Sequence, residues 1–100
     1  MKTETRELGL YIENTSFMYN NYIKPEVIRL ANKFQKGIFD SEKALITFKT
    51  IADIGAKQYA KEFAIAQQWN IIFNPQCRKE VAQYLLDVYM ENINGENPIN

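Results

Sequence analysis

Residues 40–66 read DSEKALITFKTIADIGAKQYAKEFAIA, and their apolar side chains recur at the spacing of an α-helix. Asp40 is a suitable N-cap, and Glu42 follows in the first turn, where a carboxylate interacts favourably with the helix dipole. One apolar face contains Leu45, Phe48, Ala52, Gly55, Tyr59, Phe63 and Ala66. Gly55 has no Cβ, so another helix could approach closely there. The pattern predicts a long central helix in an all-α protein.

A second, smaller apolar strip lies behind this face. Ile54 and Ile65 are eleven residues apart, almost in helical register, and Ile51 flanks them. Between the two strips we expect a solvated row formed by Lys49, Asp53, Lys57 and Lys61. The strip could be covered by a second copy of the chain, which would make a dimer. Alternatively, the N-terminal helix could wrap across it in a monomeric bundle.

The N-terminal segment predicts a helix from about Thr5 to Ile23, with Thr5 as the N-cap. Helical spacing is followed by Leu8, Ile12, Thr15, Tyr19 and Tyr22. The short run 8–12 contains Gly9 and could instead form a strand, but a lone strand would have nothing to pair with. We therefore expect a helix.

A second helix is expected to begin at Pro25, or to continue the first one through a kink at this residue. It should end near Lys36, because Gly37 suits the left-handed position that follows a helix. The inner face is expected to contain Val27, Leu30, Ala31 and Phe34. The outer face is expected to contain Arg29, Lys33 and Lys36.

After residue 66 the central helix could continue or break near residues 67–70. Asn74 and Pro75 then form a cap and a first-turn proline, so a last helix begins there and ends at Gly95. Its inner face is expected to contain Val81, Leu85, Val88, Tyr89 and Ile93, and its outer face Glu80, Asp87 and Glu91. The sequence thus predicts one small four-helix bundle-like domain over residues 1–100, frayed at 1–4 and 96–100.

Composition excludes several kinds of chemistry. The chain has 100 residues, and its twelve basic and twelve acidic residues give a formal net charge of zero, which is unlike a strong nucleic-acid binder. Because histidine is absent, Ser-His-Asp and Cys-His catalysis cannot be run by this chain alone. Its one cysteine excludes an internal disulfide and multi-cysteine zinc motifs. We expect no cofactor, no metal and no enzymatic activity.

The segment MKTETRELGL has no long apolar run, so we expect no signal peptide. No run of apolar residues approaches the roughly 20 needed for a membrane span. These features favour a cytoplasmic location without a membrane partner.

Several local motifs suggest a family. They are Leu8-Gly9-Leu10-Tyr11-Ile12-Glu13-Asn14-Thr15, Lys36-Gly37 with Asp40, Ala56-Lys57, Tyr59-Ala60-Lys61-Glu62-Phe63, and Trp69, Phe73 and Pro75. With these motifs, most of the chain resembles a group of small helical proteins encoded by bacteriophages, to which no function is assigned. The resemblance implies a phage or prophage origin and a cytoplasmic setting in an infected bacterium. It carries over no active site, because the motifs consist of core, cap and turn residues.

Two features could mark chemistry. Cys77 is predicted in the first turn of the last helix beside Arg78 and Lys79, an environment that favours a thiolate. The alternative is a small, partly buried packing residue, because no histidine or second cysteine can complete a site. The second feature is the cationic row of Arg29, Lys33 and Lys36, which could contact phosphates or could simply be a solvated helix face.

A partner surface is predicted from Ile51, Ile54, Ile65 and Trp69. Trp69 could instead close the core, together with its apolar neighbours Ile72 and Phe73. The second helix is basic on its outer side and the last helix is acidic, so the surface is dipolar. Such a surface could orient a partner or a second copy, or it could arise by chance.

These observations predict a non-enzymatic phage protein that acts by stoichiometric binding, either to itself as an oligomer or to a host or phage protein. Inhibitors of host defence, including anti-CRISPR proteins, belong to this class by size and composition. The alternative is an accessory nucleic-acid-binding protein of phage DNA or RNA metabolism that uses the cations of the second helix.

Overall fold

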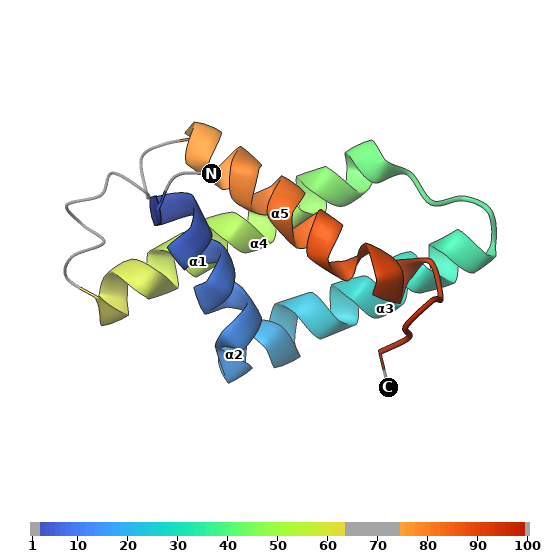
Figure 1. Cartoon of the computed structure of the whole chain (residues 1–100), viewed down its shortest axis with the longest axis horizontal. Coiled ribbons are helices and arrows are strands. Elements are labelled where there is room, and N and C mark those ends of the chain that lie inside the picture. Colours follow the sequence, from blue (N-terminus) through green and yellow to red (C-terminus); the bar gives the residue numbers. More distant parts are fainter. Residues whose placement is uncertain (1–2, 64–74, 100) are drawn as a thin grey trace.

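The computed structural model describes residues 3–63 and 75–99, and this part of the chain is all-α, as predicted (Figure 1). The elements are α1 (Thr3–Asn14), α2 (Ser16–Met18), the π-helical turn η1 (Tyr19–Ile23), α3 (Lys24–Gln35), α4 (Ser41–Glu62) and α5 (Pro75–Ile93). α5 crosses α4 in the most extensive contact between helices, and α1 packs against both (Figure 1). α4 is therefore the central helix of a small bundle.

The N-terminal segment departs from the single regular helix that its spacing predicts. Thr15 is extended, with φ −88° and ψ 118°, and separates α1 from α2. η1 then adds a π-helical turn, whose hydrogen bonds span five residues instead of four. Met18 and Ile23, which are five residues apart, are fully buried, whereas Tyr19 and Tyr22 are half-buried. The chain continues directly into α3, so Pro25 lies in the first turn of a helix that is joined to η1.

Three predicted helix ends are confirmed. The Asp40 carboxylate accepts hydrogen bonds from the backbone N–H groups of Glu42 at 2.9 Å and Lys43 at 3.4 Å, and so caps α4. Gly37 and Gly95 follow α3 and α5 with φ of +73° and +88°, which glycine adopts without a steric penalty.

α4 ends earlier than its apolar pattern predicts. Phe63 has an extended backbone, with φ −126° and ψ 107°, so the helix stops at Glu62 and measures roughly 33 Å at 1.5 Å per residue. The predicted end at Ala66 lies outside the described residues. Because Phe63 is displaced from the helical face, it is 44% exposed instead of belonging to the core. Its ring still contacts that of Tyr59, at a centroid distance of 4.8 Å.

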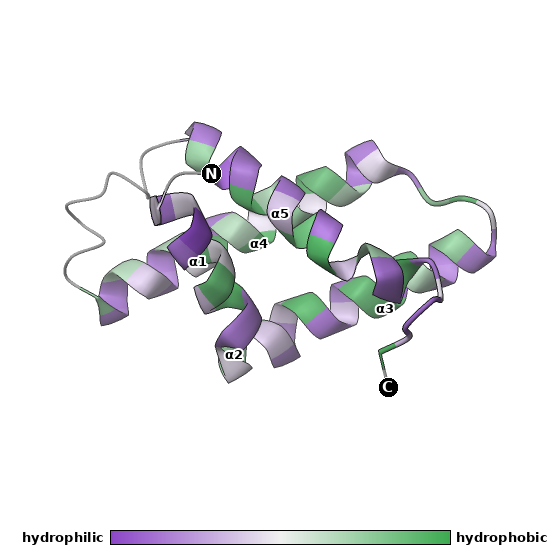
Figure 2. Ribbon diagram, viewed as in Figure 1, coloured by the Kyte–Doolittle hydropathy of each residue, from purple (hydrophilic) through white to green (hydrophobic). Residues whose placement is uncertain are grey.

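The predicted core is largely correct. Of the residues predicted to face inward, the buried ones are Leu8, Ile12, Val27, Leu30, Phe48, Ala52, Tyr59, Val81, Leu85, Tyr89 and Ile93. Leu45 and Ala31 are half-buried at its edge. Phe34 and Val88 are 40% and 38% exposed, because both lie at the margin of the buried face of their helices. Figure 2 shows apolar and polar segments alternating along α5, as expected for a helix with one buried face.

Contacts within the chain hold the first and last described residues. α1 already begins at Thr3, and Thr5 is a buried residue within it instead of its N-cap. At the other end, the backbone N–H of Asn97 donates to the carbonyl of Glu91 at 3.0 Å, and Ile99 packs against the core. The fraying that the sequence predicts for the two ends stays a prediction.

Gly55 sets the distance between α1 and α4, as its place on the apolar face suggests. A Cβ at this position would lie 2.6 Å from both Cδ1 and Cγ1 of Ile12, closer than side-chain atoms approach one another. Ile12 is fully buried and cannot move aside without disturbing its neighbours. Only glycine fits this contact.

We expect Gly55→Ala to lower the free energy of unfolding by about 1 kcal/mol, because overpacking costs roughly 1–3 kcal/mol and the gain in helix propensity offsets only about 1 kcal/mol of it. Urea denaturation followed by circular dichroism measures this loss. Ile12→Ala removes both side-chain atoms, Cδ1 and Cγ1, that the new methyl group would meet. The double variant should therefore lose less free energy of unfolding than the sum of the losses in the two single variants. A Gly55→Ala protein as stable as the wild type would contradict this packing.

Two tyrosines at the contacts of α1, Tyr84 and Tyr11, lie close to carboxylates. The Tyr84 hydroxyl on α5 donates a hydrogen bond to the Glu13 carboxylate on α1. Burial, together with this hydrogen bond, raises the pKa of Tyr84 to about 12. Burial and the Glu62 carboxylate likewise raise the pKa of Tyr11 to about 12. Both phenols therefore favour the folded state only while they are protonated.

The stability of the fold should consequently fall at alkaline pH. The unfolded phenol has a pKa of about 10, so the contribution of Tyr11 and Tyr84 is complete below pH about 10 and is lost as the pH rises through about 12. Urea midpoints measured across this range should decrease. Tyr84→Phe should make the decrease shallower, because one titrating group is removed. A decrease of the same slope in Tyr84→Phe would show that Tyr84 does not contribute.

Candidate functional site

An open groove separates η1 and α3 from α4. α3 and α4 make few direct contacts because α5 packs against both and holds them apart (Figure 1). The groove has a volume of about 370 Å³. Its lining consists of Asn21, Tyr22, Pro25, Glu26, Arg29, Thr47, Thr50, Ile51 and Ile54. We call it the α3–α4 groove.

The apolar part of this groove comes mainly from the second strip that the sequence predicts on α4. Ile51 is only 4% exposed, and Ile54 is half-buried against the core. Ile51 is therefore covered within a single chain and does not need a second copy. Ile65 and Trp69, the other residues of the predicted partner surface, lie outside the described residues. Tyr22 contributes a half-buried ring from η1, and the centroid of this ring lies 5.9 Å from the centroid of the Phe17 ring.

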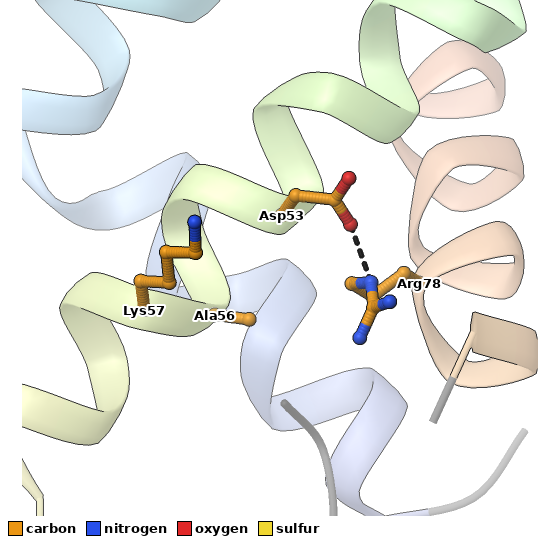
Figure 3. A pocket seen from close by; sticks show the side chains of 4 residues that line it. All are labelled: Asp53, Ala56, Lys57 and Arg78. Carbon is orange, nitrogen blue, oxygen red and sulfur yellow. Dashed lines mark ion pairs between the residues drawn. The ribbon is translucent and has the colours of Figure 1, made fainter. Parts of the chain in front are cut away.

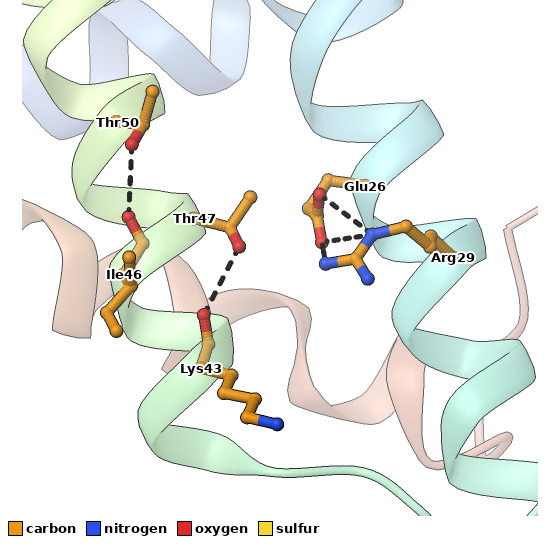
Figure 4. Close-up of polar contacts among 6 residues, drawn as sticks. All are labelled: Glu26, Arg29, Lys43, Ile46, Thr47 and Thr50. Carbon is orange, nitrogen blue, oxygen red and sulfur yellow. Dashed lines mark hydrogen bonds and ion pairs between the residues drawn. The ribbon is translucent and has the colours of Figure 1, made fainter.

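Four of the polar residues that line the groove, Thr47, Thr50, Glu26 and Arg29, already have partners (Figure 4). On α4, the hydroxyls of Thr47 and Thr50 donate to the backbone carbonyls of Lys43 and Ile46, each at 3.2 Å. On α3, the Arg29 guanidinium makes a bidentate ion pair with Glu26, with Nε donating to Oε1 at 3.0 Å. The groove therefore offers an apolar surface whose rim includes two threonine hydroxyls and an arginine that already have partners.

The three cations of the predicted phosphate-binding row lie in different surroundings. Arg29 lies in the α3–α4 groove with its charge matched by Glu26, Lys33 is half-buried, and Lys36 is exposed at the end of α3. The row does not form a uniform set of exposed, uncompensated cations. The observed geometry thus gives less support to phosphate contact than the spacing alone.

A second polar contact joins α4 to the N-terminal half of α5. The Asp53 carboxylate forms an ion pair with Arg78, beside a pocket of about 200 Å³ that Ala56 and Lys57 also line (Figure 3). The sequence predicts that Asp53 belongs to a solvated row. In the structure its carboxylate is instead paired with Arg78. Its position between two packed helices indicates a role in orienting α5 on α4.

Cys77 is a packing residue in this structure. It is 6% exposed, and its Sγ lies 3.3 Å from the Thr5 hydroxyl, which also hydrogen-bonds to Glu80 at 3.1 Å. This is the buried alternative given above for the cysteine. Within residues 3–63 and 75–99, no three Cys, Asp or Glu side chains are grouped closely enough to hold a metal ion.

Comparisons with protein-family models, curated proteins and solved structures gave no match. The resemblance to phage-encoded proteins therefore stays a prediction. Among the helices described, none combines the length and apolar character needed to cross a membrane.

Sequence reasoning identified Ile51, Ile54 and Arg29 as members of two separate candidate sites. The structure places all three around one groove. Tyr22 and Pro25, which complete it, were not predicted as site residues. No local signal in the sequence marks them, because the groove exists only once α5 has positioned α3 relative to α4.

Proposed function

We propose that this chain is a non-enzymatic phage protein that binds another protein in a fixed stoichiometry, with the α3–α4 groove as its docking surface. The observation that carries this proposal is an open apolar groove whose charged pair, Glu26 and Arg29, is matched within the chain. A site of this kind gives affinity mainly through buried apolar area.

The groove suits an apolar side chain projecting from a helix of the partner. Its volume of about 370 Å³ is large enough for one or two such side chains. Burying one leucine or phenylalanine contributes roughly 1.5–3 kcal/mol. A helix laid between α3 and α4 would repeat the way in which α5 bridges the same two helices, and would follow the helix-in-groove mode of recognition.

The phage origin in this proposal rests on the resemblance of the sequence motifs. A role against host defence is the form of the function that small size and composition favour. Nucleic-acid binding through the cations of α3 is the alternative, and it depends on Arg29 exchanging its partner Glu26 for a phosphate.

Affinity capture from infected bacterial lysate tests the proposal. We expect the wild type to capture an equimolar amount of one protein. Thr50→Arg places a large cation at the exposed rim of the groove and should reduce capture by about tenfold, which corresponds to about 1.4 kcal/mol. The matched control is Gln35→Arg, at an exposed position outside the groove lining, and it should capture as the wild type does.

Equal capture by wild type and Thr50→Arg would contradict docking in the groove. Nuclease treatment of the lysate and a gel-shift assay at low and moderate salt distinguish protein binding from the alternative function, nucleic-acid binding. Capture that is lost after nuclease treatment, together with DNA or RNA binding that persists at moderate salt, would favour nucleic acid instead.

A further inference from the structure

A second open surface lies between the N-terminal halves of α4 and α5, which diverge from the point where the two helices cross (Figure 1). It has a volume of about 300 Å³ and is lined by Leu45, Ile46, Lys49, Lys79, Ala82 and Gln83. We call it the α4–α5 wedge. Ile46 is 68% exposed, more than any other large apolar side chain in the described part of the chain.

The wedge is both apolar and positively charged. Lys49 extends from α4 and Lys79 from α5, and neither ammonium forms an ion pair with the carboxylates of residues 3–63 and 75–99. The nearby acid Asp53 is engaged by Arg78, and Glu80 accepts a hydrogen bond from Thr5. A complementary surface would therefore carry an apolar side chain flanked by carboxylates.

The outer face of α5 has this complementary character. Lys79, Gln83, Asp87 and Glu91 follow one another at intervals of four residues, so they lie along one face, and all four are exposed. The cation is near the N-terminal end of this face and the two carboxylates are near the C-terminal end. Met90 lies beside the carboxylates and is half-buried.

The charges on this face of α5 complement those on α5 of a second copy when the two helices run antiparallel. If two α5 helices pair about a two-fold axis near Leu85, Lys79 of each copy lies opposite Glu91 of the other, and Gln83 lies opposite Asp87. A parallel pairing would instead set like charges against each other. The charge pattern therefore selects one orientation.

We propose that the α4–α5 wedge is occupied by α5 of a second copy of this chain, and that each copy fills the wedge of the other. Asp87 and Glu91 of the second copy meet the lysines of the wedge, and its Met90 covers Ile46. This surface is distinct from the α3–α4 groove, which contains Ile54 of the strip that the sequence predicts for a dimer.

Sedimentation velocity of the full chain, from low to high micromolar concentration, tests the proposal. The wild type should form a reversible dimer. Lys79→Glu and Glu91→Lys should each weaken dimerisation by about tenfold, because each sets like charges against one another at two symmetric contacts. The charge exchange Lys79→Glu/Glu91→Lys should return the dissociation constant close to the wild-type value. Lys36→Glu, at an exposed site on α3, is the matched control and should have no effect.

Ile46→Glu tests the apolar part of the contact and should also weaken the dimer. Circular dichroism confirms that each variant is folded. A wild type that remains monomeric at every concentration would overturn the proposal. So would a charge-exchange variant that associates as weakly as the single variants. A dimer that Thr50→Arg dissociates and Ile46→Glu leaves intact would place the interface in the α3–α4 groove and would also overturn it.

Discussion

The packing of α5 across α4 is the contact on which the rest of the structure depends. Phe48 of α4 and Leu85 of α5 are fully buried in the shared core, and α1 packs against both helices. Gly55 lets Ile12 of α1 come close to the α4 backbone, and an ion pair between Asp53 and Arg78 joins α4 to α5. Most of the buried apolar area is therefore organised around one crossing, with α4 at its centre.

The two candidate surfaces are direct consequences of this crossing. α3 is held by α5 and η1 and makes few contacts with α4, which leaves the α3–α4 groove open. On the opposite side of the crossing, the diverging N-terminal halves of α4 and α5 leave the wedge around Ile46. The groove has its charges matched internally, whereas the wedge has two lysines without ion pairs in the described residues. They are therefore suited to different occupants.

The sequence could predict those features that depend on a few neighbouring residues. Asp40 and Gly37 act as predicted because caps and left-handed turns are local. The π-helical turn was missed, and with it the burial of Met18 and Ile23, because a regular helical period assigns the apolar face to other positions. The groove could not be predicted at all, since it joins Arg29 and Ile54 only after α5 has set the separation of their helices.

Native-state hydrogen exchange tests most directly whether α5 holds α3 away from α4. Amides in the middle of α4 and α5 should exchange only through global unfolding, because their burial is shared across the crossing. Amides of α3 should exchange faster, through local opening, since α3 lacks a packed contact with α4. Exchange from α3 that is as slow as that from α4 would show that α3 opens only with the central crossing, and would contradict this account.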